Sequence, residues 1–349
     1  MDEVALLEGL LKIYSPSHQE RDAVNYLVSA MASMGYRAFA DEAGNAVGSR
    51  GAGPDEIMLL GHIDTVAGFI DVHREEDLLY GRGAVDAKGP LACFAAAGAR
   101  VSPPPGWRIT VVGAVGEESQ SHGALFLRDR YHPQALIIGE PSKWDHITLG
   151  FKGSLWVDYT VRVSMAHTAS GIESAPEAAV RFWNELRAWC SALNPPGAGP
   201  FNQLTPTLRG MSSSSDGFDE AASLRIGLRL PPAVSPEMVI NSLQTLKGAG
   251  SMSVSEPIPP YKAEKNTPLV RAFLTAVRGA GGTPVFSFKT GTSDMNLVAP
   301  VWGCQTVAYG PGDSTLDHTP GEHVSIQEYL KSIAVLADVL SKLCEKSGR

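Results

Sequence analysis

Apolar positions along the first part of the chain predict helices that alternate with short strands. Apolar side chains spaced three or four residues apart predict amphipathic helices over 3–14 and 18–34. Further elements are predicted in the order strands near 37–40, 45–49 and 56–61, helix 87–100, strand 107–115, helix 121–129 and strand 135–138. This β-α-β-α-β rhythm predicts a largely parallel sheet covered by helices.

The pattern changes after Gly150. Between 154 and 164 apolar side chains alternate with polar ones, which predicts a strand with one buried and one solvated face. A helix over 175–192 follows, and Ser174 with Glu177 three positions later is the sequence of a capping box. The remaining elements are strands 203–211, 222–230 and 251–256 and helix 235–246. The order β-α-β-β-α-β is that of the ferredoxin-like split motif.

The first pattern then resumes. Helices are predicted over 267–280 and 326–344, with a strand at 304–308 between them, and Ser325 with Glu328 forms a second capping-box sequence. We therefore predict an α/β fold with a mostly parallel sheet. It consists of a discontinuous first domain, 1–151 and 263–349, and an inserted ferredoxin-like α+β domain, 152–262.

Composition narrows the class of protein. The 349 residues are 44% hydrophobic and 19% charged, as in ordinary globular proteins. A net charge of −8 without a basic run argues against nucleic-acid binding, and no apolar run approaches the roughly 20 residues that span a bilayer. The start of the chain lacks the pattern of a secretion signal, and the cysteines form no C-x-x-C pair. We expect a cytoplasmic protein that binds neither membrane nor nucleic acid.

Titratable side chains follow the predicted strands at the points where each strand ends. His62 and Asp64 follow one strand and, two positions apart, share a face. Glu117 and Glu118 follow the next strand, and Glu140 follows a third. Because open α/β sheets place reactive groups at the carboxyl ends of their strands, we expect these side chains to converge.

Two loops add to this set. Asp86 lies in a glycine-rich loop over 80–89, and Asp317-His318 follows the strand at 304–308. So many carboxylates in one cleft require either raised pKa values or compensating cations. Histidine with carboxylate suits zinc, cobalt or manganese rather than magnesium or calcium. The sequence therefore predicts two divalent metal ions that share a bridging carboxylate.

The same motifs, taken in order, resemble a known family. They are G-H-I-D at 61–64, G-R-G-A-V-D-A-K-G at 81–89, G-E-E-S at 116–119, G-E-P at 139–141 and D-H-T-P-G-E at 317–322. Together they resemble the two-zinc amidohydrolase and exopeptidase family that includes acetylornithine deacetylase, succinyl-diaminopimelate desuccinylase and carboxypeptidase G. The resemblance implies that the discontinuous domain is catalytic and that the insertion is a dimerisation or lid domain.

The resemblance also implies the ligands of each metal. His62, Asp86 and Glu140 would hold one ion, and Asp86, Glu118 and His318 would hold the other, with Asp86 as the bridge. Zinc is the expected metal, with cobalt as the alternative.

Two carboxylates would serve the chemistry without binding metal. Asp64 would lie behind His62 and orient it, and Glu117 would be the general base for water held between the metals. Because Glu118 is adjacent, it can bind metal while Glu117 stays free to carry a proton to the leaving amine.

Further site residues follow from the resemblance. His167 would reach the partner subunit's site and help to hold an oxyanion, unless it is a surface histidine at a strand end. Arg229 would bind a substrate carboxylate, unless it lies on a solvated strand face. Gly291, Thr292 and Ser293 form a loop that would lie beside the substrate, or a plain turn.

The substrate is narrowed by resemblance as well. Lys289 stands where many relatives have a small residue, and 211–220 lacks the asparagine-containing loop of the desuccinylases. These features resemble hydrolases of lysine and arginine biosynthesis that release lysine or ornithine from the terminal glutamate of a small acidic amino-group carrier protein. Such a carrier would meet Lys289, Arg209, Arg225 and Arg229, unless these are ordinary surface cations.

Other functions remain open from the sequence. An N-acetylornithine or N-acetyl-lysine deacetylase, or a dipeptidase, would use the same metals. A binding protein without activity is disfavoured because no ligand or base is missing. A structural zinc protein is disfavoured because such sites are closed and rich in cysteine.

Overall fold

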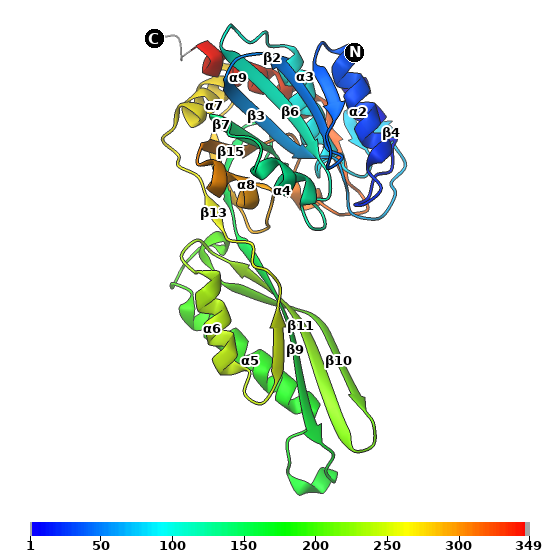
Figure 1. The fold of residues 1–349 in the computed structure, drawn as a ribbon, viewed down its shortest axis with the longest axis vertical. Coiled ribbons are helices and arrows are strands. Elements are labelled where there is room, and N and C mark those ends of the chain that lie inside the picture. Colours follow the sequence, from blue (N-terminus) through cyan, green and yellow to red (C-terminus); the bar gives the residue numbers. More distant parts are fainter. Residues whose placement is uncertain (1, 346–349) are drawn as a thin grey trace. The chain divides into compact units, whose positions relative to one another are not determined.

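The chain divides into two compact units. The computed structural model describes residues 2–345. Unit 1 runs up to Gly150 and continues over Ala263–Phe288 and from Ser293 onwards, and unit 2 consists of Phe151–Lys262 and Lys289–Thr292. Figure 1 shows the fold of both units.

Unit 1 combines helices with a large sheet and a small one. Its helices are α1 (Glu3–Leu11), α2 (Arg21–Ser33), α3 (Lys88–Ala99), α4 (His122–Arg128), α7 (Pro268–Gly279), α8 (Met295–Trp302) and α9 (Ile326–Glu345). The large sheet contains β1 (Arg37–Ala40), β2 (Ala46–Gly51), β3 (Asp55–His62), β6 (Trp107–Ala114), β7 (Ala135–Gly139), β8 (His146–Phe151), β14 (Val285–Lys289) and β15 (Gln305–Tyr309). The small sheet contains β4 (His73–Glu75), β5 (Leu78–Tyr80) and β16 (His323–Ser325). No helix within residues 2–345 has the length and apolar content to cross a membrane.

The middle of the large sheet is parallel. Its strands run in the order β1-β2-β6-β3-β7-β15-β8, with β14 also paired to β8. The neighbours β6, β3, β7 and β15 are parallel, whereas β1, β2 and β8 pair antiparallel at the two sides. The predicted α/β class is confirmed. In the register, His62 lies opposite Ala114 and Gly61 opposite Gly139, so the carboxyl ends of three strands are aligned.

Helix α3 explains the run of small residues after the glycine-rich loop. It is buried from Lys88 to Gly98 and lies against β3, β6 and β7, with α1 and α9 packed on it. A Cβ on Gly98 would lie 2.3 Å from the hydroxyl of Tyr36, and that hydroxyl donates to the carbonyl of Ala95. Small residues therefore allow the helix to approach the sheet closely.

Unit 2 has the topology that the sequence predicted. Its elements are β9 (Gly153–Ser164), α5 (Ala175–Leu193), β10 (Thr205–Ser215), β11 (Asp219–Leu230), α6 (Pro236–Leu246), β12 (Ser251–Val254), β13 (Tyr261–Lys262) and two 3₁₀ turns. The sheet order β10-β11-β9-β12, antiparallel throughout, is that of the ferredoxin-like motif. Helices α5 and α6 cover one face of the sheet (Figure 1), and α5 packs on β9, β10 and β11.

Several elements differ from the sequence prediction. Helix α1 ends at Leu11 rather than Tyr14, and β10 extends to Ser215 because its serines continue an exposed hairpin. The elements that were not predicted are β4, β5, β8, β13, β14, β16 and α8. Most are short, and α8 contains Pro300 in its interior, which disfavours a helix in any sequence-based reading.

One capping box is confirmed and the other is half formed. Ser174 Oγ accepts from the Glu177 N–H at 3.3 Å, and Glu177 accepts from the Ser174 N–H at 2.8 Å. At α9, Ser325 accepts from the Glu328 N–H, but the Glu328 carboxylate accepts from the N–H groups of Trp144 and Gly312. The Glu328 side chain therefore binds the backbone of two loops of unit 1 instead of capping the first turn of α9.

The Ser174 cap gives a stability prediction. The variant Ser174→Ala should lower the free energy of unfolding by about 1 kcal/mol, because it leaves an N-terminal N–H of α5 without its side-chain acceptor. Denaturant unfolding measures this change. The control Ser191→Ala, at an exposed position late in the same helix, should change stability by less than about 0.5 kcal/mol. Equal stability of Ser174→Ala and the unchanged protein would contradict the role of this cap.

Candidate metal centre

His62 ends the central strand β3 and is buried together with the carboxylate that orients it. His62 is 2% exposed and Asp64 is fully buried. The His62 Nδ1 donates to the Asp64 carbonyl at 3.0 Å and lies 3.5 Å from the Asp64 carboxylate. These contacts fix the ring so that Nε2 faces away from Asp64, toward the rest of the site.

Asp86 lies between the two histidines. Its Oδ1 is 3.2 Å from His62 Nε2, and its Oδ2 is 2.9 Å from His318 Nε2. His318 Nε2 is also 2.9 Å from Glu118 Oε1. The His318 Nε2 thus lies at the same distance from two carboxylates. A single N–H cannot donate a good hydrogen bond to both, whereas a metal cation can bind both carboxylates and the imidazole.

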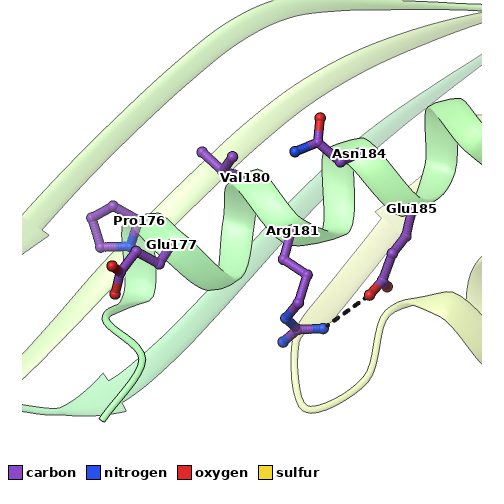
Figure 2. A pocket seen from close by; sticks show the side chains of 6 residues that line it. All are labelled: Pro176, Glu177, Val180, Arg181, Asn184 and Glu185. Carbon is purple, nitrogen blue, oxygen red and sulfur yellow. Dashed lines mark hydrogen bonds and ion pairs between the residues drawn. The ribbon is translucent and has the colours of Figure 1, made fainter. Parts of the chain in front are cut away.

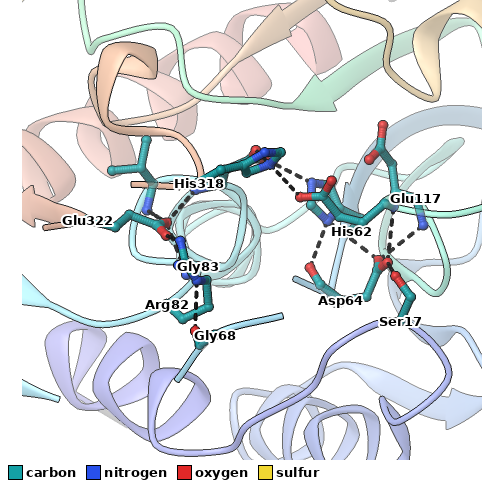
Figure 3. A network of polar contacts seen from close by, with 12 residues as sticks. Ser17, His62, Asp64, Gly68, Arg82, Gly83, Glu117, His318 and Glu322 are labelled. Carbon is teal, nitrogen blue, oxygen red and sulfur yellow. Dashed lines mark hydrogen bonds and ion pairs between the residues drawn. The ribbon is translucent and has the colours of Figure 1, made fainter. Parts of the chain in front are cut away.

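Asp64 also holds the turn that carries the paired glutamates. Its two oxygens accept from the N–H groups of Glu117 and Glu118, each at 3.1 Å. Ser17 Oγ donates to the same carboxylate at 2.7 Å. Figure 3 shows Ser17, Asp64, His62 and Glu117 converging in this way. The residue that orients His62 therefore also sets the path of the backbone at the glutamates.

The pKa values show an excess of negative charge. Hydrogen bonds to Asp86 and then Glu118 raise the pKa of His318 to about 10. Burial opposes protonation of His62, but contacts with Asp64 and Asp86 raise its pKa well above the ordinary value. Burial raises the pKa of Glu117, as do the nearby charges of Asp294, Glu140 and Glu118. Added positive charge is therefore favoured in this cluster, and divalent cations would supply it.

The donors fit divalent metal ions. Ligand atoms of Asp86, Glu118 and His318 lie within 4.8 Å of one another, as do those of His62, Glu117 and Glu118. The first of these groups is the predicted ligand set of one metal. Glu140 directly follows β7, and its charge acts on Glu117, but it is in neither group among the described residues. Imidazole and carboxylate oxygen are the donors that zinc and cobalt accept.

Two residues of the site were not predicted from the sequence. Ser17 lies between two predicted helices, and nothing in its surroundings in the sequence indicates a contact with Asp64. Asp294 is buried, its Oδ1 has no hydrogen-bond partner, and burial raises its pKa to about 7. Asp294 is in the glycine-threonine-serine-aspartate motif, so its position beside Ser293 was the available signal.

The predicted substrate residues fall into two local arrangements. In unit 2, Arg229 Nη1 donates to Thr292 Oγ1 at 3.3 Å, and the Lys289 carbonyl accepts from the Lys152 N–H at 3.2 Å. In unit 1, Ser293 is 3% exposed and its hydroxyl accepts from the Met295 N–H at the start of α8. The structure therefore brings Arg229 to Thr292, while Ser293 shapes the beginning of a helix.

His167 lies in the loop that follows β9 in unit 2. Its side chain is exposed, and Nδ1 accepts from the Ala169 N–H at 3.1 Å. This hydrogen bond orients the imidazole at the surface of the unit.

Residues 58–342 match the model of peptidase family M20/M25/M40. A LysW-lysine hydrolase of Deinococcus radiodurans is 41% identical over 347 residues, which cover 97% of this chain and 96% of that protein. A LysW-lysine/LysW-ornithine hydrolase of Sulfurisphaera tokodaii is 28% identical and matches 98% of this chain and 95% of its own length.

Solved structures share the fold. An M20-family metallo-carboxypeptidase from Sulfolobus solfataricus superposes with a TM-score of 0.79 at 19% identity, covering 99% of this chain and all of that one. Aminopeptidase PepT from Bacillus cereus superposes with a TM-score of 0.78 at 20% identity, covering 98% of each chain.

The centre predicts a metal-dependent stability. Adding Zn²⁺ or Co²⁺ to chelator-treated protein should raise the unfolding temperature, because a cation at a thousandfold excess over its Kd stabilises the folded state by about 4 kcal/mol. Thermal unfolding with and without metal measures the shift. Asp86→Asn should remove most of it, whereas Asp338→Asn, which loses only an ion pair on α9, should keep it. Unchanged unfolding of the parent protein on adding either metal would contradict the centre.

Proposed function

This chain belongs to peptidase family M20/M25/M40, and from that premise we propose that it releases lysine or ornithine from the terminal glutamate of the carrier protein LysW by metal-dependent amide hydrolysis. The reaction class follows from the family and the donor set of the centre. The substrate is supported by the names of relatives that match almost the whole chain. The observation that carries the proposal is the position of Asp86, with one carboxylate oxygen at each histidine.

We assign the ligands as two sets that share Asp86. His62, Asp86 and Glu140 would hold one ion, and Asp86, Glu118 and His318 would hold the other, with zinc or cobalt as the metal. When bound, two such cations polarise the scissile carbonyl and lower the pKa of water to about 7. The contacts of Asp86 with both imidazoles support its role as the shared ligand.

Glu117 would carry the proton. Glu117 is next to Glu118, and its backbone N–H donates to the Asp64 carboxylate. This hydrogen bond fixes the turn from which the Glu117 side chain extends. Burial and neighbouring negative charges raise its pKa, which brings the group toward the range in which a carboxylate can both accept and return a proton. Glu117 would take a proton from the attacking water and deliver it to the leaving amine.

Arg229 would bind the carboxylate of the substrate's terminal glutamate. Its hydrogen bond to Thr292 holds the guanidinium at the loop that contains Gly291, and a guanidinium fork suits a carboxylate. Lys289 and Ser293 on either side of this loop would complete the substrate-binding segment.

A cytoplasmic homodimer formed through unit 2 is part of the proposal. Strand β10 lies at the edge of its sheet, and Met211 and Ser212–Ser215 along it are exposed, so it offers backbone groups to a second strand. On α5, Val180 is 44% exposed within a surface pocket lined by Pro176, Glu177, Val180, Arg181, Asn184 and Glu185 (Figure 2). In a dimer, His167 would act in the partner's site. A fully active monomer in solution would contradict this arrangement.

The substrate is tested by comparing two amides. Lysine released from a LysW-lysine conjugate and from N-acetyl-lysine is measured by mass spectrometry, with metal content determined in the same samples. We expect kcat/KM for the conjugate to be at least tenfold higher. Equal or faster turnover of N-acetyl-lysine would identify a deacetylase instead.

Glu117→Gln tests the proton carrier. The variant should retain both metals and lose about 10²–10⁴-fold in kcat, because the amide cannot accept the proton. Glu118→Gln is the contrasting variant and should lower the metal content, since it removes a ligand. Metal analysis and steady-state rates separate the two effects. Near-normal turnover by Glu117→Gln would reject its assignment as the base.

A further inference from the structure

Glu322 is a buried acid that the proposed chemistry does not use. It is fully buried, four residues after His318. Its Oε1 accepts from three backbone N–H groups of the glycine-rich loop, those of Gly83, Val85 and Asp86, at 3.0, 3.0 and 3.1 Å. Three N–H groups that converge on one oxygen form an anion-binding nest, and the chain fills this nest with its own carboxylate.

Arg82 compensates the charge of Glu322 and extends the network. Its Nη1 donates to Glu322 Oε2 at 2.8 Å, and the side chain of Arg82 is 9% exposed. The same guanidinium donates to the carbonyls of Thr319 and Gly68 at 3.2 and 2.9 Å. Figure 3 shows Arg82, Gly83, Gly68 and Glu322 meeting in this cluster. The ion pair therefore also links three loops.

Two of these loops present proposed metal ligands. Asp86 donates its N–H to Glu322, and Thr319, which accepts from Arg82, is adjacent to His318. The Gly81 N–H also donates to the Glu322 carbonyl at 3.2 Å. Displacement of Glu322 would consequently release the loop of Asp86 and the loop of His318 together.

The shape of this loop depends on a glycine. Gly83 has φ +90°, and a Cβ there would lie 3.0 Å from the side chains of Lys88 and Thr65. A loop that depends on glycine has much conformational freedom in isolation. The carboxylate of Glu322 restricts that freedom from outside.

A buried ion pair of this kind is weak evidence for stability. Removing two charges from water costs about as much as their attraction returns, and apolar replacements are often as stable. The Glu322–Arg82 ion pair is better explained by its geometry. Only an acceptor with two oxygens can accept hydrogen bonds from the N–H nest and from Arg82 together.

We propose that Glu322, with Arg82, is a positioning residue that fixes the backbone of Asp86 relative to His318 and thereby sets the affinity of the centre for divalent metal. Substitution of residues that hydrogen-bond to metal ligands without binding the metal themselves typically changes metal affinity by 10–100-fold. The inference rests on the metal centre of the proposed function and is independent of its substrate.

The test compares Glu322→Gln with a matched variant elsewhere in unit 1. Glutamine has a single acceptor oxygen, so it cannot accept from both the N–H nest and Arg82. The control Glu56→Gln removes another buried glutamate, which is 4% exposed and accepts from Arg108 Nε at 3.0 Å and from Thr110. Glu56 lies near the start of β3, at the opposite end from His62.

The readouts are metal affinity and stability of the metal-free protein. Competition of chelator-treated protein with a chromogenic indicator gives the Kd for Zn²⁺ and Co²⁺, and thermal unfolding without metal gives stability. Glu322→Gln should raise the metal Kd 10–100-fold, and excess metal should restore much of the activity. Glu56→Gln should lower stability while leaving the metal Kd unchanged.

The outcomes separate this inference from the proposed function. Parent-like metal affinity in Glu322→Gln would overturn the positioning role while leaving the metal centre intact. Equal loss of affinity in Glu56→Gln would show a general effect of stability and would also overturn it. If the parent protein binds neither metal, both proposals fail. If Glu322→Gln does not fold, the same measurements are made on Arg82→Lys. This variant loses the hydrogen bonds to the carbonyls of Gly68 and Thr319, and we expect the same rise in metal Kd.

Discussion

Asp86 joins the two sides of the centre because each oxygen of its carboxylate meets a different imidazole. One imidazole ends β3, and the other comes from a loop far along the chain. Several negative charges are thereby forced together in a partly buried place, and the surroundings must hold them against their repulsion. The two histidines and the backbone N–H groups that face Asp64 and Glu322 provide that support.

The convergence of His62 with the glutamates could be predicted because it follows from strand direction. Apolar runs identified β3, β6 and β7, and the carboxyl ends of neighbouring parallel strands necessarily lie at one edge of the sheet. The unit 2 topology was predictable for a similar reason, since alternation in β9 and the capping box at Ser174 are local signals. In both cases the feature that determines the structure, an apolar run, an alternating pattern or a capping sequence, lies within a short stretch of the chain.

Contacts between loops could not be predicted in that way. Nothing local indicates that Ser17 donates to Asp64, or that Glu328 accepts from Trp144 rather than from its own helix start. Helix α8 was missed because Pro300 lies in its interior, where a proline disfavours a helix. The grouping of ligand atoms around Glu118 likewise depends on side-chain directions rather than on which strand each residue follows.

The discontinuity of unit 1 has a consequence for the order of events during synthesis. Glu322 lies 236 positions after Asp86, and the small sheet needs β16 to pair with β5. Nearly all of unit 2 is made in between as one continuous segment. Because domains tend to fold as they leave the ribosome, unit 2 can fold while the incomplete unit 1 still lacks α7, α9 and β15. A nascent chain therefore acquires His318 and Glu322 only after the inserted unit has already emerged.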